Sequence, residues 1–303
     1  MLLRELILSS RTALSSVYPE DEARAIVTRL GEAVLAVDSY THIIEPDRIV
    51  PDGPLIEFND AVSRLMKGEP LQYVLGYADF CGRRFRVCPD VLIPRPETEI
   101  LCMEAVEKSR KMPSLRILDL CTGSGCISWT LALSVPGSMV TGVDISDAAL
   151  SVARGQGDSL QENGRRLFDG MAENGCLAPE FVRHDVLSGA DGFDYEGVPS
   201  DFDIILSNPP YVCESERGMM RSNVLDYEPG LALFVPDDDS LKFYHSVADF
   251  SVKRLIPGGF GIVEINEAFG DAVAAIFSSA GMSGVSVLKD FGNKNRFVFF
   301  RKS

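Results

Sequence analysis

The chain is predicted to be an α/β protein with a mostly parallel sheet, preceded by a small helical bundle. Two observations predict this fold. From residue 116 onward, short apolar runs rich in β-branched residues alternate with helical patterns, which is typical of a parallel sheet with helices on both faces. Residues 1–75 instead carry apolar side chains at helical spacing. The 303 residues are enough for two domains.

Residues 1–75 are predicted to form the helical bundle. Apolar residues recur at helical spacing in segments that begin at Leu2, Ala23 and Ala61. Pro19 is followed by three acidic residues, which favours the start of a helix. Seven basic and twelve acidic residues give this region a net charge of −5.

Residues 76–94 are predicted to form a β-hairpin that connects the bundle to a second domain at 95–303. Residues 77–91 are rich in aromatic and β-branched side chains, and Cys81-Gly82 is a turn signal. Pro96 then stands at the start of a helical pattern, a position that proline favours.

Within 95–303 the strands can be placed along the chain. Apolar runs predict five strands, at 116–120, 139–143, 180–183, 203–207 and 261–265. A terminal hairpin is predicted from 286–289 and 296–300, joined across Gly292-Asn293. The polar stretch 154–174 is longer than one crossover helix needs, and both an extended helix and a mobile insertion remain open.

Composition and charge argue against several classes of function. No uncharged apolar run reaches the length of a membrane span, and the N-terminus lacks a basic segment with a cleavage site, so we expect a cytoplasmic protein without membrane contact. Seven cysteines without a C-x-x-C pair and three histidines predict reduced thiols and no metal site. The net charge of −15 opposes direct nucleic-acid binding and favours a basic protein or a small molecule as partner.

A glycine turn, Thr122-Gly123-Ser124-Gly125, follows the strand 116–120. Glycines let a ligand approach the backbone closely at the carboxyl end of a strand. Asp144 ends the next strand, 21 residues after Gly123, where a carboxylate can accept both hydroxyls of a ribose. Ser128 replaces the third glycine of a dinucleotide fingerprint, which disfavours a dinucleotide. The Leu118-Asp119 pair before the glycines favours a nucleoside-sulfonium cofactor instead. The alternative is a purely structural β-turn. The distance of Asp144 from the turn favours cofactor binding over this alternative.

The tetrapeptide Asn208-Pro209-Pro210-Tyr211 follows the strand 203–207. Its prolines restrict the backbone, so the Asn208 amide and the Pro209 carbonyl are held in place. Two carbonyl oxygens beside an aromatic ring can hold a planar –NH2 group by both of its protons. Alone, such a tetrapeptide would be interpreted as a structural turn with a packing tyrosine.

Asp185 ends the third predicted strand, where a carboxylate can meet an adenine amine. An N-terminal cap of the next helix is an almost equally good interpretation. The neighbouring His184 is interpreted as structural. Gly123, Asp144, Asp185 and Asn208 therefore converge on one edge of the sheet, which chance turns would not readily produce.

Six segments that cover nearly the whole chain in order carry a resemblance to a known family. They are 68–76, 91–99, 119–125, 143–146, 207–211 and 227–234. Pro94-Arg95-Pro96-Glu97-Thr98-Glu99 and the Glu228-Pro229 segment are far more selective than the tetrapeptide, which many amino-methyltransferases share. Through these segments the chain resembles the protein-(glutamine-N5) methyltransferase family, in particular its release factor glutamine methyltransferases.

This resemblance implies a class I methyltransferase fold, with a Rossmann-like seven-stranded sheet, and S-adenosylmethionine as methyl donor, with S-adenosylhomocysteine as product. By position, the cofactor-binding residues are Cys121, Thr122, Gly123, Ser124, Gly125, Asp144, Asp185, Val186 and Asn208. The substrate-binding residues are Asn208, Pro209, Pro210 and Tyr211, of which Asn208, Pro209 and Tyr211 are expected to be catalytic. Two residues depart from the family: Cys121 stands where glycine is usual, and Val186 stands where an aromatic residue often flanks the adenine.

The reaction that this resemblance implies is methylation of the side-chain amide nitrogen (N5) of the glutamine in the Gly-Gly-Gln loop of class I peptide-chain release factors. The protein is expected to be a monomer. Asn208 and Pro209 would each accept one amide N–H, and Tyr211 would pack on the flat amide. The alternatives are the same chemistry on a ribosomal-protein glutamine, or on an adenine amine in nucleic acid. The acidic charge argues against adenine. The intact tetrapeptide disfavours a non-catalytic scaffold that binds the same cofactor.

Overall fold

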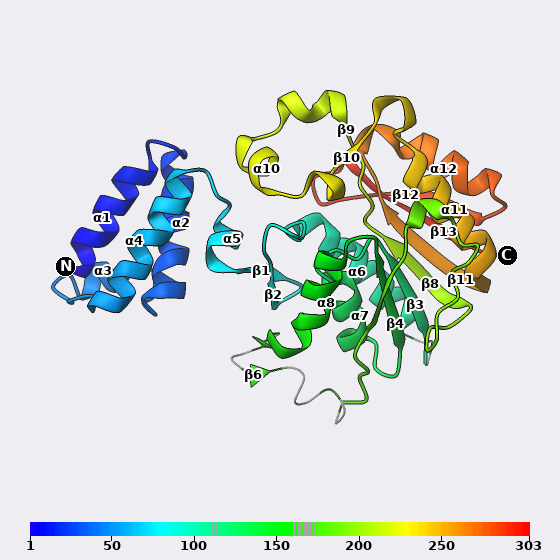
Figure 1. Ribbon diagram of the computed structural model, residues 1–303, viewed down its shortest axis with the longest axis horizontal. Coiled ribbons are helices and arrows are strands. Elements are labelled where there is room, and N and C mark those ends of the chain that lie inside the picture. Colours follow the sequence, from blue (N-terminus) through cyan, green and yellow to red (C-terminus); the bar gives the residue numbers. More distant parts are fainter. Residues whose placement is uncertain (111, 113, 160, 163–164, 167–170, 172–173) are drawn as a thin grey trace. The chain divides into compact units, whose positions relative to one another are not determined.

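The computed structural model describes residues 1–110, 112, 114–159, 161–162, 165–166, 171 and 174–303. These residues form two compact units, and Figure 1 labels the elements of each. One unit comprises Met1–Tyr77 together with Arg221–Tyr227, and the other comprises Ala78–Met220 and Glu228–Ser303. No helix among the described residues is long and apolar enough to cross a membrane.

The first unit is all-helical, as the apolar spacing predicts. Its helices are α1 (Leu3–Leu14), α2 (Glu20–Val34), α3 (Thr41–Ile44), α4 (Asp52–Met66), α5 (Leu71–Leu75) and α10 (Ser222–Tyr227). Helix α2 begins directly after Pro19, with three acidic residues in its first turn. Each longer helix buries one apolar stripe, and Leu6, Val27 and Phe58 meet in the shared core.

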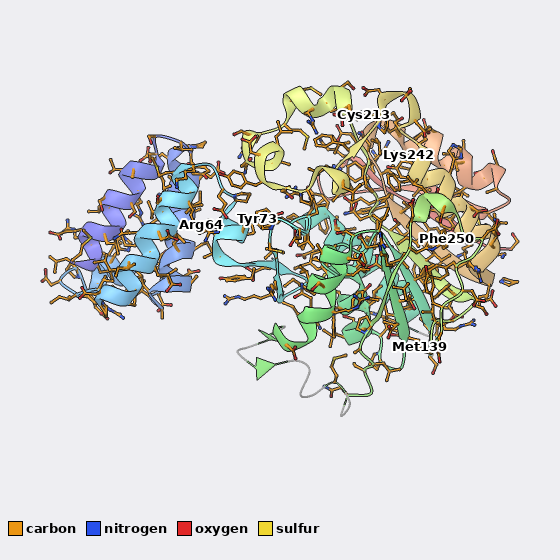
Figure 2. The ribbon with its side chains drawn as sticks, in the orientation of Figure 1. Arg64, Tyr73, Met139, Cys213, Lys242 and Phe250 are labelled. Carbon is orange, nitrogen blue, oxygen red and sulfur yellow. The ribbon has the colours of Figure 1, made fainter. Side chains whose placement is uncertain are left out.

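Polar contacts fix the chain that follows α4. The Arg64 Nε donates to Glu69 Oε2 at 2.8 Å, and a terminal guanidinium nitrogen donates to the Tyr73 carbonyl at 3.2 Å. Arg64 and Tyr73 are both labelled in Figure 2, on α4 and α5. One guanidinium thus joins the end of α4, the turn and α5.

Residues 221–227 belong to the helical unit, although the sequence places them inside the segment 95–303. The Tyr227 hydroxyl donates to the Lys67 carbonyl at 3.0 Å, and Arg221 lies 3.3 Å from Glu22. These partners are 160 and 199 residues apart in sequence. Local periodicity carries no information about such contacts, so the sequence could not predict them.

The second unit is built on one seven-stranded sheet. Its strands are β3 (Arg116–Leu120), β4 (Met139–Asp144), β7 (Glu180–Arg183), β8 (Phe202–Ser207), β11 (Leu255–Glu264), β12 (Ser283–Lys289) and β13 (Asn295–Arg301). The strand order is β12-β13-β11-β8-β3-β4-β7. All neighbours pair in parallel except β13, which is antiparallel to both β11 and β12. The mostly parallel sheet and the terminal hairpin are confirmed.

Strand β11 is longer than the predicted 261–265. It begins at Leu255, and its pairing with β8 is irregular between Leu255 and Phe260. Proline and two glycines at 257–259 interrupt the apolar pattern there, which is why the sequence reveals only the second half of the strand.

Helices cover both faces of the sheet. One face carries α6 (Pro96–Ser109), α7 (Cys126–Ser134) and α8 (Asp147–Ser159), and the other carries α11 (Lys242–Arg254) and α12 (Gly270–Ser279). Successive residues of β8 point to opposite faces: Ile204 and Leu206 pack with the first group, and Ile205 packs with the second. Phe250, labelled in Figure 2, belongs to α11 and is fully buried in the second cluster.

The predicted hairpin is present as β1 (Tyr77–Phe80) and β2 (Arg83–Arg86). Cys81 and Gly82 form its turn with positive φ angles of 48° and 74°. It belongs to a small sheet of order β1-β2-β5-β6, with β5 at Gln161–Glu162 and β6 at Arg165–Arg166.

The predicted stretch 154–174 thus begins as a continuation of α8 to Ser159, followed by these two short strands. The rest of that prediction, at 160, 163–164, 167–170 and 172–173, lies outside the described residues. The remaining short elements are β9 (Val212–Cys213), β10 (Phe234–Val235) and the 3-10 turns η1 (Val186–Ser188), η2 (Glu214–Met219), η3 (Gly230–Ala232), η4 (Asp237–Asp239) and η5 (Glu267–Phe269).

The absence of a side chain at Gly261 lets the Phe300 ring pack closely against β11 at the centre of the sheet. It lies in β11 between β8 and β13, where an added Cβ would overlap the Phe300 ring and lie 2.9 Å from the Ile205 carbonyl. We expect Gly261→Ala to lower the free energy of unfolding by about 1–3 kcal/mol, as overpacked cores do. Urea denaturation followed by circular dichroism measures this change.

Gly218→Ala is the matched control in the same unit, because its Cβ would have nothing within 4 Å. This variant should change the free energy of unfolding by less than about 0.5 kcal/mol. Equal stabilities of the two variants would contradict the packing described for Gly261.

Candidate functional site

A cavity lies at the carboxyl ends of β3, β4 and β8, where open α/β sheets bind their ligands. Its lining includes most of the predicted site residues, namely Cys121, Thr122, Gly123, Ser124, Asp144, Asp185, Val186, Asn208 and Pro210. It also includes Arg95 and Thr98 from the segment 94–99, and Pro229 and Leu231 from the Glu228-Pro229 segment. Among the described residues that line it, Gly125, Pro209 and Tyr211 do not appear.

The turn after β3 depends on left-handed backbone. Cys121, Gly123 and Gly125 have φ angles of 63°, 54° and 78°. A left-handed residue other than glycine costs about 1–2 kcal/mol, which explains why glycine is usual at the position of Cys121. The Cys121 side chain packs against the core on the α11 side, and burial raises the pKa of its thiol well above the ordinary value.

Gly125 has a packing role. A Cβ at this position would lie 3.0 Å from the Ala153 Cβ and 3.2 Å from the Phe181 ring. Its lack of a side chain lets α7 start close to α8 and β7. By contrast, a Cβ on Gly123 would have nothing within 4 Å, so the open space at Gly123 leaves room for a ligand against the backbone.

Asp119 organises this turn, although it was not among the predicted site residues. Its buried Oδ2 accepts hydrogen bonds from Thr122 Oγ1 at 2.6 Å and from Ser128 Oγ at 2.7 Å. Burial raises the pKa of the Asp119 carboxyl to about 6. Ser128, which replaces the third fingerprint glycine, therefore braces the turn. The Leu118-Asp119 pair directly before the turn was the available signal.

Asp144 also braces the turn from the end of β4. Its Oδ2 accepts from the Gly123 amide at 2.9 Å and its Oδ1 from the Ser146 amide at 3.0 Å. Burial raises the pKa of this carboxyl. Each carboxylate oxygen has two acceptor sites, so both oxygens keep capacity for a further donor such as a ribose hydroxyl.

At the end of β7, Asp185 forms the cap that the alternative interpretation predicts. Its Oδ1 accepts from the Leu187 amide at 2.9 Å, and the residue also lines the cavity. The neighbouring Val186 is buried at the cavity wall. The His184 ring nitrogens lie 3.1 Å from the Tyr195 hydroxyl and 3.0 Å from the Gly189 carbonyl, which fits a structural histidine.

The Asn208 amide is held by a chain of hydrogen bonds. Asn208 Nδ2 donates to Thr98 Oγ1 at 3.1 Å, and Thr98 Oγ1 donates to Glu264 Oε2 at 2.7 Å. The other Glu264 oxygen accepts from the Tyr211 hydroxyl at 3.0 Å. Glu264 is 1% exposed, and burial raises the pKa of its carboxyl to about 7. Since Asn208 Nδ2 faces Thr98, its Oδ1 is left for the cavity.

Thr98 and Glu264 were not predicted as site residues. Thr98 belongs to the selective segment 94–99, which was a usable signal. Glu264 ends β11 and was counted only as part of a strand. The Tyr211 hydroxyl donates to Glu264, so Tyr211 takes part in the same set of hydrogen bonds.

Glu228 brings the two selective segments together. One carboxylate oxygen lies 2.7 Å from a guanidinium nitrogen of Arg95, and the other accepts from the Ile93 amide at 3.2 Å. The Glu228 side chain is only 1% exposed. Because Arg95 and Pro229 line the cavity, this buried ion pair shapes part of its wall.

Known proteins match the chain from end to end. The family described as PrmC N-terminal domain matches residues 5–76, and the family described as Methyltransferase small domain matches residues 98–225. A release factor glutamine methyltransferase of Bacteroides thetaiotaomicron is 39% identical over 288 residues, which are 95% of this chain and 96% of that protein. One from Flavobacterium psychrophilum is 32% identical over 301 residues, 98% of each chain.

One solved structure also matches much of the chain. The protein-(glutamine-N5) methyltransferase (release factor-specific) from Alicyclobacillus acidocaldarius is 28% identical, with a TM-score of 0.41. The match covers 72% of this chain and 99% of that chain.

The buried Asp119 carboxyl makes a testable contribution to stability. Its pKa of about 6 in the folded chain lies above the ordinary 3.8, so folding stabilises the protonated form. This stabilisation is complete below about pH 4 and is lost as the pH rises through 6. Between pH 4 and 8 the loss amounts to about 3 kcal/mol at most.

Asp119→Asn keeps one acceptor for Thr122 and Ser128 and removes the titration. The free energy of unfolding of the wild type, relative to that of this variant, should therefore fall as the pH rises from 4.5 to 8. Urea denaturation at several pH values measures the difference. A difference that does not change with pH would show that Asp119 does not titrate as described.

Proposed function

Because the chain belongs to the release factor glutamine methyltransferase family, we propose that it transfers a methyl group from S-adenosylmethionine to the side-chain amide nitrogen of the Gly-Gly-Gln glutamine in class I peptide-chain release factors. The observation that carries this proposal is the fixed amide of Asn208. Its Nδ2 is engaged by Thr98, and its Oδ1 is left for a donor in the same cavity as Asp144. The wild type should add one methyl group to purified release factor and none to its Gln→Ala loop variant, as read by mass spectrometry.

The cavity suits an adenosine cofactor. Both Asp144 oxygens keep acceptor capacity for a ribose diol, and Gly123 leaves its backbone uncovered. We assign cofactor binding to Cys121, Thr122, Gly123, Ser124, Gly125, Asp144, Asp185, Val186 and Asn208, with Gly125 acting through the packing of α7. The bound sulfonium supplies an activated methyl group.

The chain's own contribution is to hold the substrate amide. An amide nitrogen is a poor nucleophile because its lone pair is delocalised into the carbonyl, and in-line displacement depends strongly on positioning. In the proposed mechanism Asn208 Oδ1 and the Pro209 carbonyl each accept one N–H, with Pro210 and Tyr211 completing the substrate site. As positive charge develops on the nitrogen, these acceptors bind it more strongly. The product nitrogen loses its extra proton after transfer, so no general base is needed.

We further propose that residues 1–75 recognise the release factor and that residues 95–303 carry out catalysis. Residues 76–94 connect these two domains. A loop glutamine offers little contact area, and the net charge of −5 on 1–75 suits a basic partner. The enzyme acts as a monomer in the cytoplasm, where its seven free cysteines stay reduced, and it does not bind nucleic acid directly.

Asn208→Ala removes the proposed acceptor. We expect turnover on a Gly-Gly-Gln peptide to fall by about a hundredfold or more, which corresponds to roughly 3 kcal/mol, as for the loss of one such group in other active sites. Cofactor affinity, measured by isothermal titration calorimetry, should change far less. Near-normal turnover of this variant would refute the role of Asn208.

Asn208→Asp is the companion variant. It keeps an acceptor for the substrate but presents a second acceptor to Thr98 where Asn208 has a donor. We expect turnover between that of the wild type and that of Asn208→Ala. A rate equal to the wild type would show that the donor half of the amide is unimportant.

The recognition role of residues 1–75 can be tested by charge reversal. Simple truncation is unsuitable, because Arg221–Tyr227 packs within the same unit and would lose its partners. Glu57 and Asp60 are exposed on α4. The double variant Glu57→Lys, Asp60→Lys should raise the KM for intact release factor, most strongly at low salt, and leave the rate on a short peptide unchanged.

The control places the same change of charge on the second unit. Asp201 and Asp271 are exposed, and neither is among the described residues that line the cavity. Reversing both should leave the KM for release factor near the wild-type value. Equal effects of the two double variants would show that only the total charge matters.

A further inference from the structure

We propose that Thr98 and Glu264 are positioning residues that orient and polarise the Asn208 amide for methyl transfer. The inference rests on the proposed function, since it gives these two side chains a part in that reaction. It goes further because it assigns the polarisation of Asn208 to the charge of Glu264, which lies at the inner end of a hydrogen-bond chain.

One proton sets the direction of the hydrogen bonds that link Asn208, Thr98 and Glu264. A threonine hydroxyl carries a single hydrogen, and Thr98 gives it to Glu264 Oε2 at 2.7 Å. Toward Asn208 the hydroxyl therefore offers only lone pairs, and it accepts from Nδ2 at 3.1 Å. A flipped Asn208 amide would set Oδ1 against an oxygen without a proton. Thr98 thereby selects the rotamer that leaves Oδ1 for the substrate.

Glu264 is itself firmly held. Its second oxygen accepts from the Tyr211 hydroxyl at 3.0 Å, and the residue is 1% exposed at the end of β11. Arg296 acts on it electrostatically and is fixed in turn by Asp290 at 3.1 Å. Both carboxylate oxygens are thus engaged by donors from different segments, which leaves the carboxylate little freedom to turn away from Thr98.

The hydrogen-bond chain also transmits the effect of the Glu264 charge to Asn208. In the proposed complex each hydrogen bond donates inward: from the substrate N–H to Asn208, from Asn208 to Thr98, and from Thr98 to the Glu264 carboxylate. Aligned hydrogen bonds in a poorly solvated site polarise one another. Negative charge at the inner end increases the electron density on Asn208 Oδ1. The acceptor is therefore strongest when the substrate nitrogen becomes positive.

A pH dependence follows from the same geometry. The charged or titratable groups that act on Glu264 are Tyr211, Arg296, Glu97 and Tyr244. With a pKa of about 7, the Glu264 carboxyl gains a proton as the pH falls below neutrality. Protonation removes the charge at the end of the chain, so turnover should fall on the acid side.

Thr98→Val removes the link while keeping the side-chain shape. We expect its kcat on a Gly-Gly-Gln peptide to fall by about tenfold to a hundredfold, with KM for the peptide and Kd for the cofactor within a few-fold of the wild type. Thr98→Ser restores the hydroxyl and should recover most of the lost kcat. This recovery separates the hydrogen bond from a general effect on folding.

Ser109→Ala is the matched control. Ser109 is another buried hydroxyl of α6, but it donates to the Val106 carbonyl and has no link to Asn208. Its variant should keep the wild-type kcat. If Thr98→Val turned over as fast as Ser109→Ala, the proposed positioning role would be wrong.

Glu264→Gln separates charge from position. A glutamine can still accept from Thr98 through its carbonyl and donate to the Tyr211 oxygen through its amide. We expect its kcat at pH 8 to fall by about tenfold, and the fall of kcat toward acid pH to disappear. A wild-type rate with an unchanged pH profile would overturn the electrostatic role, even if Thr98→Val failed to fold.

The two proposals fail in different ways. If the wild type did not methylate release factor or its peptide, the proposed function would be wrong. If the wild type were active but Thr98→Val and Glu264→Gln matched it, only the positioning role would be lost. Cofactor binding by each variant, measured by calorimetry, shows that its cavity is intact.

Discussion

The buried carboxylate of Glu264 joins parts of the second unit that are distant in sequence. It accepts hydrogen bonds from Thr98 on α6 and from Tyr211 after β8, and it lies within the field of Arg296 on β13. Burying a carboxylate is costly unless donors satisfy it, and removal of a partner exposes that cost. The position of the Asn208 amide therefore depends on the correct packing of all these segments, which couples the site to the completed fold.

A second buried carboxylate has the corresponding role beside the turn after β3. Asp119 receives two hydroxyl donors, while Asp144 receives two backbone amides. Together they brace a turn that holds Cys121 in the left-handed region. The strain at Cys121 can be tolerated because these hydrogen bonds determine the backbone around it. Hydrogen bonds thus brace both sides of the cavity.

Much of the fold could be predicted because its signals are local. The strands 116–120 and 139–143 were placed almost to the residue, since each is a short, mostly apolar segment closed by a turn. The first half of β11 was missed because proline and glycine at 257–259 conceal it. No local signal indicates that residues 221–227 pack with the helical unit, because their partners Lys67 and Glu22 are more than 150 residues away in sequence.

By itself the sequence determined the α/β class, the edge of the sheet that holds the site, and the residues Gly123, Asp144 and Asn208 that meet there. These follow from rules about strand ends, which act over a few residues. Only the tertiary structure decided which way the Asn208 amide faces and what holds it. Thr98 lies 110 residues from Asn208 and 166 residues from Glu264 in sequence, and packing brings the three together. No local pattern predicts these contacts.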